Sequence, residues 1–238
     1  MNTSTQHSTN SDSTPGYSET IAKSASLTTH WLTLGAVAGP ILFTLAWFVL
    51  GFLSPGYTLF GTRIPSYSPM SQPISGLGMG ITAPFMNAAF VLSGILLLAG
   101  VIGVVRIIGA GGQTWVCATL LALSPSGLII CGIYHLDSFL PHLIGFLLAC
   151  GAPVLSFLVT GLFLRRFSSF RRFGTWLLLG SLLTLVLMVL FFMNFTPTAA
   201  GSEVGVAGLI QRILAIEVLA WFAALGWLAF RRSSRSAF

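Results

Sequence analysis

A few polar or ionisable residues of this chain fall within or next to long apolar stretches, where they could bind a ligand or do chemistry: Ser75, Asn87, His135, Asp137, His142, Arg212 and Glu217. Hydrocarbon solvates such groups poorly, so their side chains are expected to face protein or a water-filled cavity. An ionisable residue at such a depth is by default a hypothesis for a functional site. We therefore predict that these residues gather into a polar cluster that binds a ligand.

Three of these residues, His135, Asp137 and His142, have the side chains of a zinc site that would activate water for hydrolysis. The other histidines cannot join them, because His7 lies in a polar N-terminal segment and His30 lies at the opposite end of the first apolar stretch. The chain has neither the HExxH motif of a zinc protease nor the GxSxG motif of a serine hydrolase. A metal-dependent hydrolase is therefore the alternative interpretation, and in the preferred one we expect no catalytic residue, metal or other cofactor.

Arg212 and Glu217 differ in their expected depth within the last apolar stretch. At about 1.5 Å per residue, Arg212 lies about 6 Å from the start of this stretch and Glu217 about 14 Å, near the middle of a bilayer. Their separation along a helix corresponds to a rotation of about 140°, so the two side chains cannot readily pair with each other. We predict Asp137 as the partner of Arg212.

Two interpretations of the cluster involve no reaction. In the first, the polar groups only fix the packing of the helices, and the protein is a structural or regulatory subunit. In the second, which we prefer, they line a pocket on the outer side that takes a small molecule, a lipid headgroup or a proton. The protein then binds or moves a ligand and is not an enzyme.

These residues would be positioned by apolar stretches that are each long enough, at about 20 residues, to cross a bilayer as a helix. Charged residues make up only 7% of the 238 residues and the mean hydropathy is +0.90, values that a soluble domain would not have. We predict an all-α integral membrane protein, a bundle of six transmembrane helices over residues 31–53, 83–108, 114–134, 139–164, 174–195 and 208–230. Residues 1–30 are predicted to be a disordered polar tail and residues 231–238 a basic tail.

The distribution of positive charge predicts the orientation of the bundle. Lysine and arginine gather at one end of the predicted spans, and only Arg63 and Arg212 lie towards the other end. Because basic residues favour the cytoplasmic side, both termini should be cytoplasmic. Basic clusters beside spans meet lipid headgroups, so we expect no nucleic-acid partner. The long outer link, residues 54–82, has too many prolines and glycines for a helix and is predicted to be a structured cap.

Small residues and prolines predict how the helices pack. Gly35 and Gly39 have the small-xxx-small spacing of closely packed membrane helices. Prolines within the spans, Pro153 among them, remove a backbone donor and free a carbonyl one turn earlier. We expect neighbouring helices, or the hydroxyls of Ser124 and Ser126, to satisfy these carbonyls.

Several short strings resemble a known family in their order along the chain. They are Ser54-Pro55-Gly56-Tyr57, Pro73-Ile74-Ser75-Gly76-Leu77-Gly78, Asn87, Asp137 followed by His142, and Gly208-Leu209-Ile210-Gln211-Arg212-Ile213. Together they resemble the bacterial and archaeal membrane family known as domain of unknown function 998, over about residues 32–230. The resemblance implies a six-helix protein of a prokaryotic cell membrane without an assigned reaction. It also adds Tyr57 to the candidate binding residues.

Overall fold

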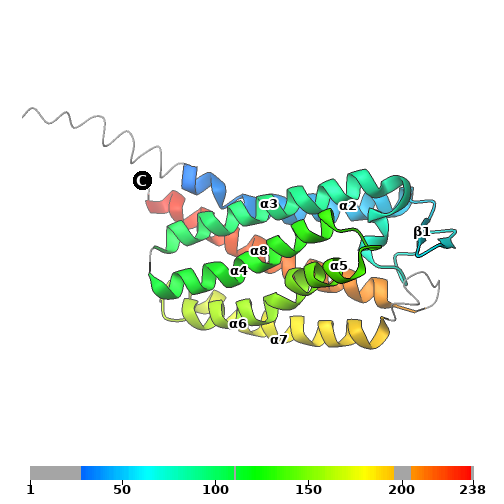
Figure 1. Ribbon diagram of the computed structural model, residues 1–238. Helices are drawn as coiled ribbons and strands as arrows, with labels where there is room; N and C mark the ends of the chain where they lie inside the picture. Colours follow the sequence, from blue (N-terminus) through cyan, green and yellow to red (C-terminus); the bar gives the residue numbers. More distant parts are fainter. Residues whose placement is uncertain (1–27, 110, 196–204, 237–238) are drawn as a thin grey trace, which may run out of the picture.

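The computed structural model describes residues 28–109, 111–195 and 205–236, and these form a bundle with six helical segments long and apolar enough to cross a membrane (Figure 1). A helical turn that begins at Thr28 precedes the first labelled helix, and a π-helical segment, η3 (Leu147–Gly151), joins two helices into one span. The helices are α2 (Gly35–Leu53), α3 (Ala83–Ile108), α4 (Gly112–Ile133), α5 (Phe139–Phe146), α6 (Ala152–Leu164), α7 (Arg171–Asn194) and α8 (Ala207–Ser236).

The six predicted spans are confirmed. Apart from the end of α8, the largest shifts at the end of a span are from 31 to 28, from 83 to 80 and from 174 to 171. Helix α8 continues to Ser236 and takes up most of the predicted basic tail. Residues 28–30 of the predicted N-terminal tail are helical, whereas residues 1–27 lie outside the described residues.

The outward faces of the helices are apolar, as a membrane requires. Phe52, Leu182 and Met193 are 77%, 59% and 76% exposed, and many other large apolar side chains on the same faces are exposed too. A protein dissolved in water rarely exposes so much contiguous apolar surface. Because helices satisfy their own backbone hydrogen bonds, these faces can lie against hydrocarbon.

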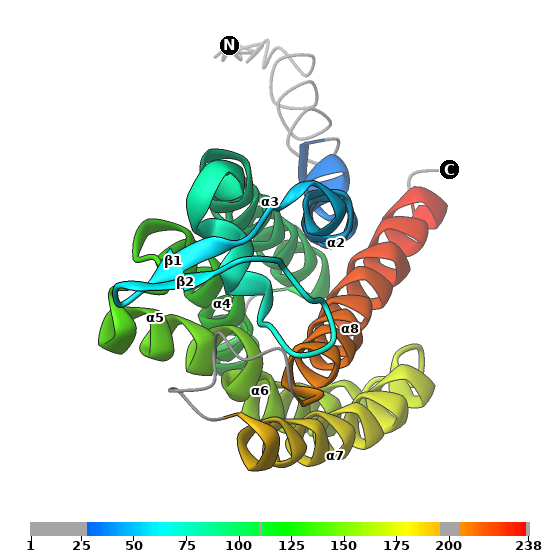
Figure 2. The same cartoon turned by 90° about the vertical axis from the view of Figure 1, so that its right-hand side faces the viewer.

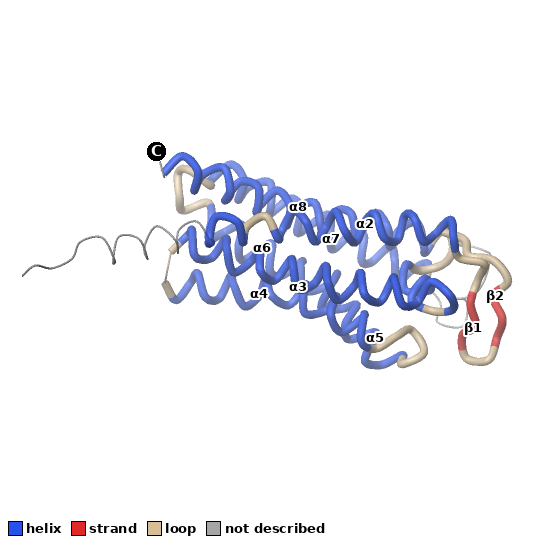
Figure 3. Tube along the Cα trace, turned by 90° about the horizontal axis from the view of Figure 1, so that it is seen from above, coloured by secondary structure: helices blue, strands red, loops and turns tan. Residues whose placement is uncertain are grey.

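The helices lie roughly along one direction, and residues 54–82, here called the cap, cross one end of the bundle (Figures 2 and 3). Helix α8 packs against α2 on one side and α7 on the other, and α3 packs against both α2 and α4. The end of α8 and the start of the first helix lie at the end of the bundle opposite the cap (Figure 1). The prediction that the long link is a structured cap is confirmed.

Helices α2 and α3 pack in close contact through glycines. A Cβ atom on Gly35 would lie 2.2 Å from the carbonyl oxygen of Leu96, and one on Gly39 would lie 2.7 Å from that of Ser93. In the other direction, a Cβ on Gly100 would lie 2.1 Å from the backbone nitrogen of Ala36. The close packing predicted from Gly35 and Gly39 is confirmed, and α3 contributes glycine to the same contact.

The carbonyl that Pro153 frees is satisfied by a neighbouring helix. Pro153 has no N–H, so the carbonyl of Ala149 lacks its usual partner one turn later. The hydroxyl of Ser124 on α4 donates a hydrogen bond to this carbonyl, with an oxygen–oxygen distance of 2.7 Å. The predicted role of Ser124 is confirmed, and the bond fixes the π-helical segment η3 against α4.

Candidate functional site

The cap begins with a short β-hairpin that lies over the end of the bundle (Figure 2). Strand β1 (Tyr57–Leu59) pairs antiparallel with β2 (Thr62–Ile64), and the turn between them contains Gly61 with φ +79°. Two short 3₁₀ helices follow, η1 (Ile74–Gly78) and η2 (Gly80–Thr82), and lead into α3. The hairpin and η1 are in contact, since the ring of Tyr57 occupies the space where a Cβ on Gly76 would stand.

The side chain of Arg212, near the start of α8, binds backbone carbonyl groups of the cap. Its Nη1 donates to the carbonyl oxygens of Pro69 and Gln72, at 2.8 and 3.0 Å, and to that of Gly208 in its own helix, at 2.9 Å. Its guanidinium carbon lies 5.4 Å from the centre of the Trp47 ring on α2. We call this set of contacts, together with the bond to Tyr67 described next, the Arg212 clasp.

Tyr67 completes the clasp through its hydroxyl group. Arg212 Nη2 donates to the hydroxyl of Tyr67, which in turn donates to the carbonyl of Pro73, 3.1 Å away. Burial raises the pKa of Tyr67 to about 12, although the nearby charge of Arg212 opposes this rise. The hydroxyl therefore keeps its proton near neutral pH and can continue to donate to Pro73.

The first turn of α8 holds the cap at further points. Gly208 lies against the cap so closely that a Cβ there would be 2.3 Å from the carbonyl oxygen of Gln72. The backbone N–H of Leu209 donates to the carbonyl of Met70, at 2.9 Å, and Gln211 Oε1 accepts a hydrogen bond from the N–H of Ile74, at 2.7 Å. The string Gly208–Arg212 is thus a surface that binds the cap.

The predicted ion pair between Asp137 and Arg212 is wrong. Asp137 is exposed, in the connection before α5, whereas Arg212 is only 5% exposed beneath the cap. Within residues 28–109, 111–195 and 205–236, Arg212 makes no ion pair. Its Nη1 and Nη2 donate to the carbonyl and hydroxyl groups of the clasp, and its buried Nε has no partner among these residues. The prediction considered only side chains as partners, whereas the cap offers carbonyls, which also solvate a cation.

Ser75 and His142 are brought together by the cap. Ser75 Oγ in η1 lies 2.8 Å from Nε2 of His142 on α5, and Nδ1 of the same ring lies 2.7 Å from the carbonyl oxygen of Tyr134. A carbonyl can only accept, so we assign the proton of the neutral imidazole to Nδ1. Nε2 is then an acceptor, and the hydroxyl of Ser75 donates to it. Both side chains are buried.

The alternative metal site is not assembled. His135 and Asp137 are exposed, whereas His142 is buried with both ring nitrogens already hydrogen-bonded. In the described part of the chain, no group of three or more His, Cys, Asp or Glu side chains lies close enough together to hold a metal ion. The geometry therefore gives no support to the zinc hydrolase interpretation.

Two further predicted residues hold η1 in place, Asn87 from α3 and Tyr57 from within the cap. Asn87 on α3 donates from Nδ2 to the carbonyl of Gly78, at 3.2 Å, and a Cβ on Gly78 would lie 2.5 Å from Asn87 Oδ1. Tyr57 is fully buried between the hairpin and η1. Both are therefore part of the packing that holds η1, and through it Ser75, in place.

Glu217 lies apart from the cap, between α7 and α8. It accepts hydrogen bonds from the hydroxyl of Thr184, at 2.8 Å, and from the indole nitrogen of Trp221, at 2.6 Å. Gly180 on α7 leaves the space that this indole occupies, since a Cβ there would be 2.5 Å from the indole nitrogen. The prediction placed Glu217 in the same cluster as Arg212, but its observed contacts join two helices elsewhere in the bundle.

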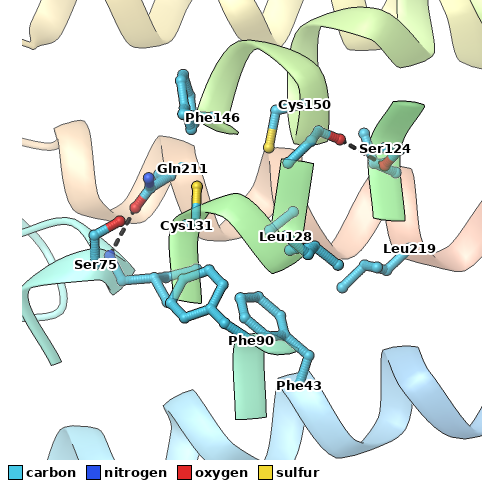
Figure 4. Close-up of a pocket in the computed structure, with 14 residues that line it drawn as sticks. Phe43, Ser75, Phe90, Ser124, Leu128, Cys131, Phe146, Cys150, Gln211 and Leu219 are labelled. Carbon is cyan, nitrogen blue, oxygen red and sulfur yellow. Dashed lines mark hydrogen bonds between the residues drawn. The ribbon is translucent and has the colours of Figure 1, made fainter. Parts of the chain in front are cut away.

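Two cavities adjoin Ser75. The inner cavity lies among α2, α3, α4, η3 and α8, and the cap-side cavity lies between α5 and α7 beneath the cap; each has a volume of about 40 Å³. Ser75, Phe146 and Gln211 line both cavities, and Figure 4 shows them at one end of the inner one. His142 lines the cap-side cavity. A space of this size holds a few water molecules and is far below the about 300 Å³ of an ordinary ligand site.

The prediction missed Gln211, Tyr67 and Phe146. Gln211 could have been identified from the sequence, because burying an amide within an apolar stretch costs free energy unless the amide is hydrogen-bonded. Its Oε1 is bonded to Ile74, and its Nε2 has no hydrogen bond to any residue that the structure describes. Tyr67 and Phe146 carried no such signal, since aromatic residues are common both in loops and in membrane helices.

Comparison with known proteins gives one match. A family model described as protein of unknown function (DUF998) matches residues 37–228, which is most of the chain. No curated protein and no solved structure matches the chain. The match includes the strings that form the clasp and the Ser75–His142 contact.

Proposed function

The chain belongs to this family, whose description assigns no reaction, and from the geometry of its own residues we propose that it is a membrane protein that binds a lipid-like molecule. The apolar tail of the ligand would occupy the inner and cap-side cavities, with its polar end beside Ser75, His142 and Gln211. Of the ligands expected from the sequence, this proposal selects an uncharged amphiphile.

The observation that carries the proposal is the pair of apolar cavities that meet at uncharged polar side chains. The rings of Phe43, Phe90 and Phe146 line the inner cavity together with aliphatic side chains, and this lining suits a hydrocarbon tail. Among the described residues, no Lys, Arg, Asp or Glu lines either cavity. An ion would lose its hydration there without gaining a counter-charge, so a neutral polar group fits better.

The cap-side cavity offers a route from the surrounding lipid. Phe139 on α5 and Phe192 on α7 line it and are 39% and 44% exposed, so the cavity approaches the outer face of the bundle between these helices. At about 40 Å³, neither cavity admits a tail until its wall moves. Phe146 borders both cavities, and rotation of its ring would join them.

The structural alternative draws support from a different observation. The Arg212 clasp and the Glu217 contacts hold helices and cap together, as expected of a subunit whose polar groups only fix packing. That interpretation accounts for Arg212 and Glu217. It does not account for the cavities beside Ser75, and for this reason we prefer ligand binding.

We also propose that the protein lies in the cell membrane, with the cap facing outward and both termini in the cytoplasm. The support is charge: Arg106, Arg165, Arg172 and Arg231 lie at the bundle end opposite the cap. The cap carries Arg63, whereas Arg212 is buried beneath it. Basic residues near the ends of spans favour the cytoplasmic side.

Labelling of single cysteines tests this orientation. Thr62→Cys in the hairpin and Ser168→Cys in the connection between α6 and α7 both place a thiol at an exposed position. In intact cells, a membrane-impermeant maleimide should label Thr62→Cys and leave Ser168→Cys unlabelled until the cells are lysed. The reverse pattern would contradict the orientation. Of the native cysteines, Cys117 and Cys131 are buried, and the half-buried Cys150 is replaced by alanine in both variants to keep the background low.

Mass spectrometry of the purified protein tests ligand binding. The protein extracted from its native membrane should retain a neutral amphiphile. Ala215→Leu adds three carbon atoms to the lining of the inner cavity and should lower the retained amount at least about tenfold, because the cavity has no room for both. Ala88→Leu, at an exposed position on α3, is the matched control and should retain the wild-type amount.

Two results would contradict the proposal. One is a wild-type protein that retains no amphiphile in stoichiometric amount. The other is equal retention by Ala215→Leu and Ala88→Leu. If Ala215→Leu does not elute as a single folded species, Ala149→Val fills the same cavity from η3 with a smaller change.

A further inference from the structure

We propose that Ser75 and His142 form a nucleophile–base pair that transfers an acyl group from an ester or thioester lipid bound in the cavities. This inference rests on the proposed function, because the lipid site brings the substrate to Ser75. It goes beyond binding by assigning a reaction to that site. The pair lies outside any GxSxG string, which is why the sequence did not indicate it.

The geometry of the pair meets the requirements of an activated serine. A nucleophilic hydroxyl needs a base within about 2.6–3.2 Å, and a third group must orient that base. Ser75 Oγ lies 2.8 Å from His142 Nε2, and the Tyr134 carbonyl holds His142 Nδ1 at 2.7 Å. The carbonyl fixes the tautomer whose Nε2 can accept a proton. It takes the orienting position that a carboxylate has in many serine enzymes.

Gln211 is the group that would stabilise the oxyanion. It lines both cavities together with Ser75, and Figure 4 shows the two side chains at the same end of the inner cavity. The bond from the N–H of Ile74 holds Gln211 Oε1, which fixes the plane of the amide. Its Nε2 makes no hydrogen bond within the described part of the chain, so it has hydrogens to donate to a substrate oxygen. Side-chain amides are known oxyanion donors.

The reaction has two balanced steps. Ser75 Oγ attacks the carbonyl carbon of the lipid ester while its proton moves to His142 Nε2, and the alcohol or thiol leaves with that proton. The acyl group is then bound to Ser75. Water, deprotonated by His142, attacks the acyl-serine and releases a carboxylic acid, and the proton returns to Ser75. The sum is one ester or thioester and one water converted to one acid and one alcohol or thiol.

Ser124 provides an internal control for this chemistry. Its side chain lines the same inner cavity, so an apolar reagent that reaches Ser75 also reaches the neighbourhood of Ser124. However, the hydroxyl of Ser124 donates to the carbonyl of Ala149, and a carbonyl cannot take its proton as a base does. Reactivity that depends on the base should therefore appear at Ser75 alone.

A long-chain alkyl fluorophosphonate tests the proposal on the full-length protein in its native membrane. Serine attack on phosphorus displaces fluoride, and peptide mass spectrometry then identifies the labelled residue. We expect label on Ser75 of the wild-type protein and none on Ser124. His142→Gln can still hydrogen-bond to Ser75 but is not a base, so it should lower the labelling rate at least about 100-fold.

The outcomes separate this inference from the proposed function. Label on Ser75 that is lost in His142→Gln supports the pair, provided that both proteins retain the same amphiphile. An unlabelled wild-type protein that still retains its amphiphile overturns the reaction and leaves binding intact. Equal labelling of the wild type and His142→Gln, or label on Ser124 alone, also overturns it. A protein that retains no amphiphile and takes no label contradicts both proposals.

Discussion

Replacing Arg212 with alanine should lower the free energy of unfolding by about 3 kcal/mol or more, since it leaves several buried acceptors without a donor. The carbonyls of Pro69 and Gln72 would each lose a hydrogen bond, and so would the hydroxyl of Tyr67. A buried acceptor without a partner costs on the order of 1–3 kcal/mol. The loss should appear as lower thermal stability in detergent and as proteolysis within the cap.

Related variants determine how much of this effect belongs to the clasp. Tyr67→Phe removes one hydroxyl and should destabilise by about 1 kcal/mol. Combined with Arg212→Ala, it should add less than its own effect, because both changes remove the same hydrogen bond. Arg63→Ala, on the exposed hairpin, is the matched control and should unfold like the wild type. If Arg212→Ala also unfolds like the wild type, the clasp does not hold the cap.

Gly100→Ala, which adds a single methyl group, should lower the free energy of unfolding about as much as Arg212→Ala. The Cβ of alanine there would lie 2.1 Å from the backbone nitrogen of Ala36 and 2.5 Å from its Cβ, so α2 and α3 would have to separate. Overpacking costs up to about 3 kcal/mol when the neighbour cannot move aside. Here the neighbour is a helix backbone. We expect Gly100→Ala to lose about that much stability, measured by thermal or SDS-induced unfolding.

The same substitution at Gly112 is the control. Gly112 begins α4, and a Cβ there would meet nothing within 4 Å. Since alanine restricts the unfolded chain more than glycine does, Gly112→Ala should be neutral or stabilising by up to about 1 kcal/mol. Equal effects of the two substitutions would show that the α2–α3 contact does not depend on glycine.

The spans could be predicted from the sequence because the signal is both long and local. A stretch such as residues 83–108 is apolar over most of its length, and its helix ends where the sequence indicates, at Ile108. The close α2–α3 contact was predictable from the spacing of Gly35 and Gly39. The bond from Ser124 was predictable because a proline inside a helix always frees a carbonyl.

The candidate site could be predicted only in part. The cost of burying polar groups identified Ser75, His142 and Arg212 as unusual, but it did not identify their partners. Arg212 binds backbone carbonyls, which every residue has and which leave no mark in a sequence. Ser75 and His142 meet because the cap folds over the bundle, and no spacing along the chain predicts that contact. Cavities depend on side-chain packing and are likewise invisible before the fold is known.

The clasp has a consequence for how such proteins diverge over generations. A guanidinium that donates to backbone carbonyls recognises the backbone conformation of a loop and does not depend on the identity of its side chains. Substitution of an outward-pointing side chain such as that of Met70, which is 49% exposed, should therefore leave the clasp intact, whereas Arg212 and Gly208 cannot be replaced without loss of their contacts with the cap. The same helix bundle and clasp could therefore carry caps with different exposed side chains.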